Sequence, residues 1–233
     1  MKFNESLPAQ YIQLIQELNN TEHELPEAFI SQEIDQVMDK QKQRSAVIAP
    51  DREYSYEEFG EAVKAIAAFV DSKKIAKNES VAIMLHKSFE QITAAWGVVY
   101  QAKTYTPIEY DVPIHRVQDC IEMANAVLII TDAESKTRLL EGEIAKNVEI
   151  YTFAEAYEIG RKQKRVDVKV PEADDVFAII FTSGSTGKPK GVMVTYENIK
   201  NCFAHTKQYY NVTEQTIVIS VTNFCHDLSV FDV

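Results

Sequence analysis

The sequence has few cysteines, and their arrangement excludes several classes of protein. The 233 residues contain Cys120, Cys202 and Cys225, which lie far apart and form no C-x-x-C pair. Disulfide-rich secreted proteins and zinc ribbons have more cysteines at closer spacing. We therefore expect each cysteine to be a small apolar packing residue in a protein of the reducing cytoplasm. The histidines show no metal-ligand spacing, so we expect no metal held by the protein alone.

Long apolar runs and an excess of positive charge are also lacking. The N-terminus reads Met-Lys-Phe-Asn-Glu-Ser, without the apolar core of a signal peptide, and no run approaches the roughly 18 apolar residues of a membrane span. Lys and Arg number 24 against 35 Asp and Glu, which gives a net charge of −11. Such a chain is a poor partner for nucleic acids and for anionic membranes. We expect neither partner.

Glycine is scarce as well, yet three of the seven glycines fall in one short segment. Residues 181–191 read Phe-Thr-Ser-Gly-Ser-Thr-Gly-Lys-Pro-Lys-Gly, and no Asp or Glu occurs between Val176 and Tyr196. Apolar runs at 176–181 and 192–194 predict a strand on each side of this loop. Accessible backbone N–H groups, hydroxyls and ammonium groups suit a polyphosphate. The alternative is a flexible linker rich in Gly and Ser, which rarely separates two β-type runs.

Two common phosphate-binding loops do not match this segment. A Walker loop has four residues between its glycines, whereas two separate Gly184 from Gly187, and Pro189 follows Lys188. The dinucleotide fingerprint G-x-G-x-x-G is absent. The candidate phosphate-binding residues are Thr182, Ser183, Gly184, Ser185, Thr186, Gly187, Lys188 and Lys190.

Apolar periodicity in the rest of the chain predicts strands that alternate with helices. Strands are predicted at 45–49, 80–85, 126–130, 148–152 and 216–221, and helical spacing is found at 11–18, 29–38, 59–70, 88–101, 117–121 and 199–210. Ser55 and Glu58 form a predicted capping box, and residues 105–108 are expected to begin a turn. This alternation predicts an α/β fold with a largely parallel sheet.

We predict three parts along the chain. Residues 1–43 form a helical lead-in with one amphipathic helix lying on the core. Residues 44–165 form a first α/β subdomain, and residues 166–233 begin a second α/β subdomain that carries the glycine-rich loop. The boundary is placed in the charged segment 161–175, which begins with Arg-Lys-Gln-Lys-Arg. This basic run could attract an anion, although a solvated loop is favoured.

Segment 181–192 resembles the signature loop of the adenylate-forming superfamily, which includes acyl-CoA synthetases, luciferases and the adenylation domains of nonribosomal peptide synthetases. Further segments resemble motifs of the peptide synthetase branch in the expected order; they are 54–59, 97–108 with Pro113 and Arg116, and 224–232. Residues 18–22 resemble the linker that precedes such domains. The resemblance covers nearly the whole chain and implies layered sheets with flanking helices, as in the N-terminal portion of that superfamily's large domain.

The resemblance implies a reaction and its cofactors. A substrate carboxylate attacks the α-phosphate of ATP, which gives an acyl-adenylate and pyrophosphate. The glycine-rich loop would grip the β- and γ-phosphates, with Mg²⁺ sharing the charge. The acyl group would then load the phosphopantetheine thiol of a peptidyl carrier protein domain.

The fourth motif of the family bears on the substrate. In members that activate amino acids, an Asp in this motif pairs with the α-ammonium group, and Asp227 occupies that position. Leu228 and Phe231 would line the side-chain pocket. The alternative to substrate binding by Asp227 is a helix-capping role. The alternative function for the chain is that of a fragment of an acyl- or aryl-CoA ligase.

Several segments depart from the family pattern. His226 stands where the branch usually has Phe, Tyr196 replaces a common His, and residues 101–107 replace Ala-Gly-Gly-Ala-Tyr-Val-Pro with Gln-Ala-Lys-Thr-Tyr-Thr-Pro. The later motifs for adenine, ribose and the catalytic Lys are missing, so no catalytic set is complete. We expect the N-terminal half of an adenylation domain, inactive without the C-terminal part, with an exposed apolar edge at 229–233. A non-catalytic half that assembles with a separate chain is a further alternative.

Overall fold

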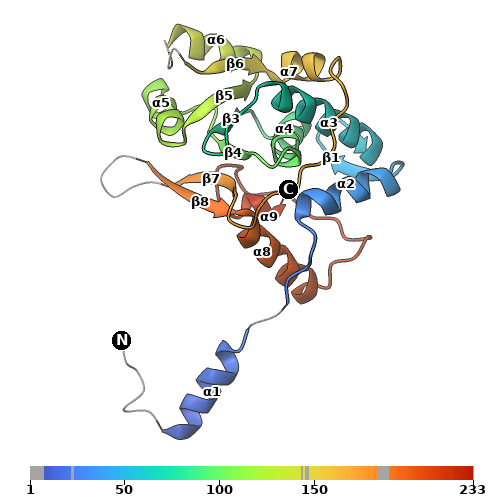
Figure 1. Cartoon of the computed structure of the whole chain (residues 1–233), viewed down its shortest axis with the longest axis vertical. Coiled ribbons are helices and arrows are strands. Elements are labelled where there is room, and N and C mark those ends of the chain that lie inside the picture. Colours follow the sequence, from blue (N-terminus) through green and yellow to red (C-terminus); the bar gives the residue numbers. More distant parts are fainter. Residues whose placement is uncertain (1–7, 22–23, 143, 145–146, 183–188, 233) are drawn as a thin grey trace.

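The computed structural model describes residues 8–21, 24–142, 144, 147–182 and 189–232. Within these residues, one six-stranded sheet has the spatial order β6-β5-β3-β4-β7-β8 (Figure 1). Its strands are β3 (Ser80–Met84), β4 (Thr104–Pro107), β5 (Ala126–Thr131), β6 (Glu149–Thr152), β7 (Val176–Thr182) and β8 (Lys190–Thr195). Neighbouring strands run parallel except for the antiparallel pair β7 and β8. The α/β class with a largely parallel sheet is confirmed.

Helices cover both faces of this sheet, because alternate residues of a strand point to opposite sides. Val81 and Ile83 share a core cluster with residues of α3 (Tyr56–Ser72), α4 (Phe89–Tyr100) and α7 (Phe153–Gly160). Ala82 and Met84 share a second cluster with residues of α5 (Ile114–Met123) and α6 (Ala133–Glu141). The central strand β3 is therefore enclosed on both sides, whereas β8 at one edge of the sheet is largely exposed.

Local hydrogen bonding explains where the helices begin. Ser55 Oγ accepts a hydrogen bond from the Glu58 N–H at 3.2 Å, and the Ser55 N–H donates to Glu58 Oε2 at 2.9 Å. The predicted capping box at the start of α3 is therefore confirmed. Thr195 caps α8 (Tyr196–Tyr209) in the same way, with its Oγ1 accepting from the Asn198 N–H at 3.2 Å.

Four helices are followed by a residue in the left-handed backbone conformation, a position that glycine usually occupies. These residues are not glycine but Lys74 (φ 55°), Ala102 (51°), Asn125 (47°) and Asn211 (50°). After α4, the Ala102 N–H donates to the Val99 carbonyl at 2.9 Å, and the Lys103 N–H donates to the Val98 carbonyl at 3.2 Å. These two bonds define a Schellman motif. Alanine in this left-handed conformation costs about 1 kcal/mol relative to glycine.

Two sequence predictions in the sheet region are wrong. Residues 105–108, expected to begin a turn, belong mostly to the fully buried strand β4, which lacks alternation because both of its faces are covered. Residues 216–221, predicted as a strand, form no strand in the described structure, and Ile217 and Ile219 are 76% and 77% exposed. A β-type pattern does not by itself supply a hydrogen-bonding neighbour.

The lead-in contains two helices with different surroundings. α2 (Ile30–Lys40) packs on α3 through the buried Met38, so the predicted amphipathic helix on the core is confirmed. α1 (Ala9–Asn19) has no buried residue and stands apart from the sheet at the bottom of Figure 1. A separate antiparallel pair, β1 (Ser45–Ile48) and β2 (Glu53–Ser55), lies beside α3. No described helix has the length and apolar content that a membrane crossing requires.

The C-terminal part of the chain corrects two further expectations. Cys120 is buried as expected, but Cys202 is exposed on α8, so it is not a core residue. Ser229, in the short helix α9 (Ser229–Asp232), is buried, and Val230 packs against the main core. The apolar edge expected at 229–233 is therefore not found in its described part, and exposed apolar side chains occur at 217–221 instead. β7 joins β4 through the pair Tyr105 and Ala178, and the subdomain boundary at 165/166 stays a prediction.

Candidate functional site

The candidate site lies where two parallel strands end. β4 ends at Pro107 and β7 ends at Thr182, and because the strands are parallel neighbours their carboxyl ends share one edge of the sheet. Residues just beyond β4 and at the end of β7 line a cavity of about 520 Å³, hereafter the edge cavity. In open α/β sheets this edge is where ligands bind. The size is typical of small-molecule sites.

The glycine-rich loop begins at this cavity. Thr182, which lies on the cavity wall, pairs in register with Lys190 of β8. The hydroxyl of Thr182 reaches the Lys190 carbonyl at 3.5 Å, and both side chains are exposed. The candidate residues Ser183, Gly184, Ser185, Thr186, Gly187 and Lys188 lie outside the described residues, so their roles stay predictions. Lys190 is not on the described cavity wall, and its role also stays a prediction.

A hydrogen-bonded turn at residues 222–229 forms another part of the cavity wall. Asn223 organises this turn, since its Oδ1 accepts from the Cys225 N–H at 2.9 Å and its Nδ2 donates to Glu109 Oε1 at 2.8 Å. The Ser229 hydroxyl donates to the Phe224 carbonyl at 2.8 Å. Phe224 is buried against Tyr105 of β4, with ring centroids 5.7 Å apart. The turn is therefore fixed to the carboxyl end of β4 by a polar and an aromatic contact.

This turn brings Asp227 to the same cavity as Thr182. The side chain of Asp227 is exposed, and its Oδ1 accepts a hydrogen bond from the Leu228 N–H at 2.8 Å. Leu228 is 67% exposed and is not on the described cavity wall. The side chain of Phe231 lies outside the described atoms. Among the candidate residues, the structure therefore brings together Thr182 and Asp227 and leaves Leu228 apart.

The electrostatic environment of the cavity disfavours a further negative charge near the turn. Burial first, and then the charges of Glu109, Cys120 and Asp111, raise the pKa of the Cys225 thiol to about 12. The thiol therefore stays protonated at neutral pH. The half-buried Arg116 supplies positive charge on the same wall.

A carboxylate cluster elsewhere does not belong to this cavity. Glu172, Asp174 and Asp175 lie close enough together to share a metal ion, but none of them lines the edge cavity. Lys77 already forms ion pairs with Glu172 and Asp175, each at 2.6 Å. Exposed acidic groups are common without a metal, so this cluster is explained by its ion pairs.

Sequence reasoning missed Glu109 and Cys225 as residues of the cavity wall, and it missed Asn223, which bonds the turn to Glu109. Glu109 follows β4 closely, and treating 104–107 as a parallel strand would have placed it at the ligand-binding edge. Asn223 and Cys225 flank Phe224, which begins the fourth motif, and no local pattern distinguishes them from ordinary turn residues.

The tertiary structure thus defines an α/β protein with a largely parallel sheet and a cavity of mixed polar and apolar lining at the carboxyl ends of β4 and β7. The model of the AMP-binding enzyme family matches residues 34–233, and the chain belongs to this family. Bacitracin synthase 1 of Bacillus licheniformis is 30% identical over 190 residues, which cover 82% of this chain and 3% of that protein. Gramicidin S synthase 2 of Brevibacillus brevis is 27% identical over 215 residues, which cover 92% of this chain and 5% of that protein.

Solved structures share the fold at lower identity. The nonribosomal peptide synthetase FmoA3 in its AMPPNP-bound form superposes with a TM-score of 0.86 at 20% identity, covering 97% of this chain and 23% of that chain. The o-succinylbenzoate coenzyme A synthetase of Bacillus subtilis in complex with AMP has a TM-score of 0.72 at 20% identity. The match covers 85% of this chain and 52% of that chain. The chain therefore spans a small part of the synthetases and about half of the coenzyme A synthetase.

Proposed function

We propose that this chain is part of an ATP-dependent enzyme that activates an amino acid. An oxygen of the substrate carboxylate attacks the α-phosphorus of ATP, the bond to the bridging oxygen breaks, and pyrophosphate leaves. The carrier thiol then loses its proton and attacks the acyl carbon, which releases AMP and forms a thioester. The observation that carries this proposal is the edge cavity of about 520 Å³, which joins the start of the phosphate loop at Thr182 to the carboxylate of Asp227.

At the phosphate end, the chain's donors and cations stabilise the leaving group. Thr182, the hydroxyls and N–H groups of residues 183–187, and Lys188 and Lys190 would hold the β- and γ-phosphates. Charge that builds on a departing pyrophosphate is stabilised most by donors already in place. Mg²⁺ bound to ATP would supply part of the neutralisation of that charge. Arg116 adds a cation to the wall of the same cavity.

At the substrate end, Asp227 holds the α-ammonium group. Its Oδ1 accepts a hydrogen bond from the Leu228 N–H, which orients the carboxylate. Because a carboxylate accepts several hydrogen bonds, it can still accept one from the ammonium group. Glu109 adds negative charge and fixes the turn through Asn223. Leu228 follows on the same turn and Phe231 belongs to α9, and their contact with the substrate side chain is part of the proposal.

The partners follow from the reaction. A peptidyl carrier protein domain with phosphopantetheine would accept the acyl group, and the rest of an adenylation domain would supply adenine contacts and the catalytic lysine. We propose that residues 1–233 alone do not turn over ATP. The three free cysteines favour the reducing cytoplasm.

Amino-acid-dependent exchange of labelled pyrophosphate into ATP tests this function. We expect no exchange with the 233-residue chain for any common amino acid. We expect exchange with one or a few amino acids when the chain is extended by the rest of an adenylation domain. Asp227→Asn in the extended protein should lower the exchange by at least about 100-fold, because losing a charge-assisted hydrogen bond to the ammonium group costs about 3 kcal/mol. Glu141→Gln, at an exposed residue of α6, serves as the control.

An acyl- or aryl-CoA ligase is the second candidate, supported by the fold shared with the coenzyme A synthetase above. Such a substrate has no α-ammonium group, so Asp227→Asn would leave activity unchanged and carboxylic acids without an amino group would be accepted. A third candidate is a non-catalytic half that assembles with a separate chain, supported by the exposed apolar residues at 217–221. A shift in gel filtration on mixing the chain with a second adenylation half would favour it.

A further inference from the structure

α1 carries an apolar stripe that contacts nothing in the described structure. Tyr11, Leu14, Ile15 and Leu18 follow the spacing of one helix face and are 51%, 49%, 44% and 69% exposed. Helices of 11 residues are marginal in water, and in proteins they owe their stability to packing of the apolar face. This helix therefore needs a surface on which to lie.

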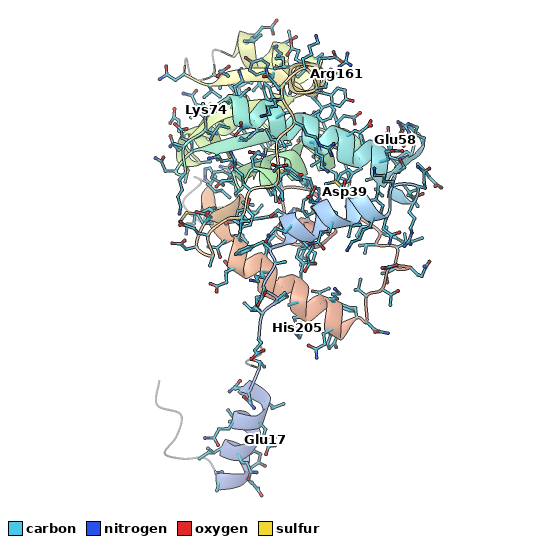
Figure 2. The ribbon with its side chains drawn as sticks, turned by 45° about the vertical axis from the view of Figure 1, so that its right-hand side comes forward. Glu17, Asp39, Glu58, Lys74, Arg161 and His205 are labelled. Atoms are coloured by element: carbon cyan, nitrogen blue, oxygen red, sulfur yellow. The ribbon has the colours of Figure 1, made fainter. Side chains whose placement is uncertain are left out.

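An apolar groove of about 410 Å³ begins where the connection from α1 reaches the core. We define the α8 groove by the wall residues Pro26, Ala28, Phe203, Tyr210, Val212 and Val218. Tyr210 and Val218 remain 66% and 55% exposed. Exposed apolar surface of this kind marks a contact site rather than ordinary protein surface. Figure 2 shows the two elements apart, with Glu17 on α1 and His205 on α8.

The tether and the charges favour α1 of the same chain as the occupant. Residues 20–25 connect α1 to Pro26, which is itself part of the groove, and a stretch of this length reaches roughly 20 Å. A short tether gives an effective concentration in the millimolar range, far above that of a second molecule. Glu17 is the charged residue of α1, and the groove carries Lys200 and Lys207 against Glu33. The opposite net charges favour contact.

We propose that α1 folds back and lays its apolar stripe in the α8 groove, closing over the start of α2 and the end of α8. The contact buries two apolar surfaces that the open arrangement leaves in water. It also brings the lead-in against residues 212–218 and so covers part of the apolar segment that has no strand partner. This inference does not depend on the proposed adenylating activity.

Amide hydrogen exchange of the whole chain tests the docking. Residues 14–18 should exchange at least about tenfold more slowly than in a peptide of residues 1–25, equally at 1 and about 100 µM protein, because docked helices are protected from opening. Leu14→Ala/Leu18→Ala should abolish this protection, and so should Tyr210→Ser/Val218→Ser in the groove. Gln13→Ala/Gln16→Ala, on the polar face of α1, should retain it.

Three results would overturn the proposal. Exchange at the rate of the free peptide means that α1 does not dock. Protection that survives Tyr210→Ser/Val218→Ser, with the fold intact by circular dichroism, means that α1 docks elsewhere. Protection that rises with concentration, together with a dimer in light scattering, means that the groove is filled by α1 of a second copy.

Discussion

Two apolar runs in this chain have similar sequences and opposite surroundings. Residues 126–131 read Ala-Val-Leu-Ile-Ile-Thr and form β5 between β3 and β6, with Ile129 and Ile130 fully buried. Residues 216–221 read Thr-Ile-Val-Ile-Ser-Val and form no strand in the described structure, with Ile217 and Ile219 more than three-quarters exposed. The second run is at least as rich in β-branched residues as the first, so β propensity does not explain why only the first forms a strand. The two runs differ instead in their surroundings, because within the described residues only the first has neighbouring strands and covering helices.

The comparison shows that the first run is stabilised within this chain and the second is not. β5 has a parallel strand on each side and helices on both faces, so five of its six residues are buried. The second run has its apolar side chains in water, a condition that favours association with another surface. The same change made in both runs should therefore have very different effects.

The largest expected difference comes from truncating one isoleucine in each run. Ile129→Ala should lower the free energy of unfolding by about 4 kcal/mol, because it leaves a cavity in a closed core. Ile219→Ala should change it by less than about 0.5 kcal/mol, since the side chain is 77% exposed. Urea unfolding monitored by circular dichroism measures both. Equal losses would mean that 216–221 is packed in solution.

The next largest effect tests the helices that cover β5. A Cβ at Gly160, the last residue of α7, would lie 1.8 Å from the Ala65 carbonyl oxygen of α3. Gly160→Ala should therefore force α7 and α3 apart and destabilise the fold by about 3 kcal/mol. Gly60→Ala is the matched control, because its Cβ would approach Met38 Cβ no closer than 3.3 Å. A Gly160→Ala protein that unfolds at the same urea concentration as the control would contradict this packing.

A smaller effect, of opposite sign, is expected at the turn that leads into β4. Ala102→Gly should raise the free energy of unfolding by about 1 kcal/mol, because glycine adopts a φ of 51° without the steric cost of a Cβ. Asn211→Gly should change the free energy of unfolding by only about a few tenths of a kcal/mol, since asparagine tolerates this conformation better than alanine. The two midpoints in urea check the expectation, and a lower stability of Ala102→Gly would refute it.

The smallest effect concerns the outer neighbour of β5. Lys73 at the end of α3 lies 2.5 Å from Glu149 of β6, and this ammonium, followed by the Tyr151 hydroxyl, lowers the pKa of Glu149 below its ordinary value of 4.5. A lowered pKa in the folded state gives stability that is present above about pH 4.5 and is lost as the pH falls through the folded pKa. Glu149→Gln should cost less than about 1 kcal/mol at pH 7.

The dependence on pH separates this pair from a general effect of charge. The difference between Glu149→Gln and the unaltered protein should shrink toward zero at pH 3, as measured by urea unfolding at both pH values. Glu141→Gln on α6 should match the unaltered protein at each pH. A difference that is the same at pH 3 and pH 7 would show that the ion pair does not contribute.

Much of the fold could be predicted because its elements are determined locally. The capping residues Ser55 and Thr195 and the long apolar runs at 80–85 and 126–130 mark their elements in the sequence itself. β4 was missed because four buried residues that end in proline show no alternation. The segment 216–221 was misjudged because strand formation depends on a partner that the pattern cannot reveal.

The candidate site could be predicted only in part. The hydroxyl and glycine pattern predicts a phosphate loop and the resemblance to the fourth motif predicts a role for Asp227, and both roles stay predictions. That Thr182 and Asp227 meet at one cavity depends on the parallel pairing of β4 with β7 and on Asn223 binding Glu109. These contacts join residues more than 70 positions apart and leave no local pattern.

The most direct test of the proposed phosphate-binding loop is a titration of the 233-residue chain with inorganic pyrophosphate and Mg²⁺, followed by ³¹P line broadening. We predict millimolar binding that Lys188→Ala weakens about tenfold, as expected for loss of one phosphate contact of about 1.4 kcal/mol. Lys164→Ala in the basic run 161–165 should leave it unchanged. No broadening with the unaltered chain, or equal weakening by the two substitutions, would contradict a phosphate site in this loop.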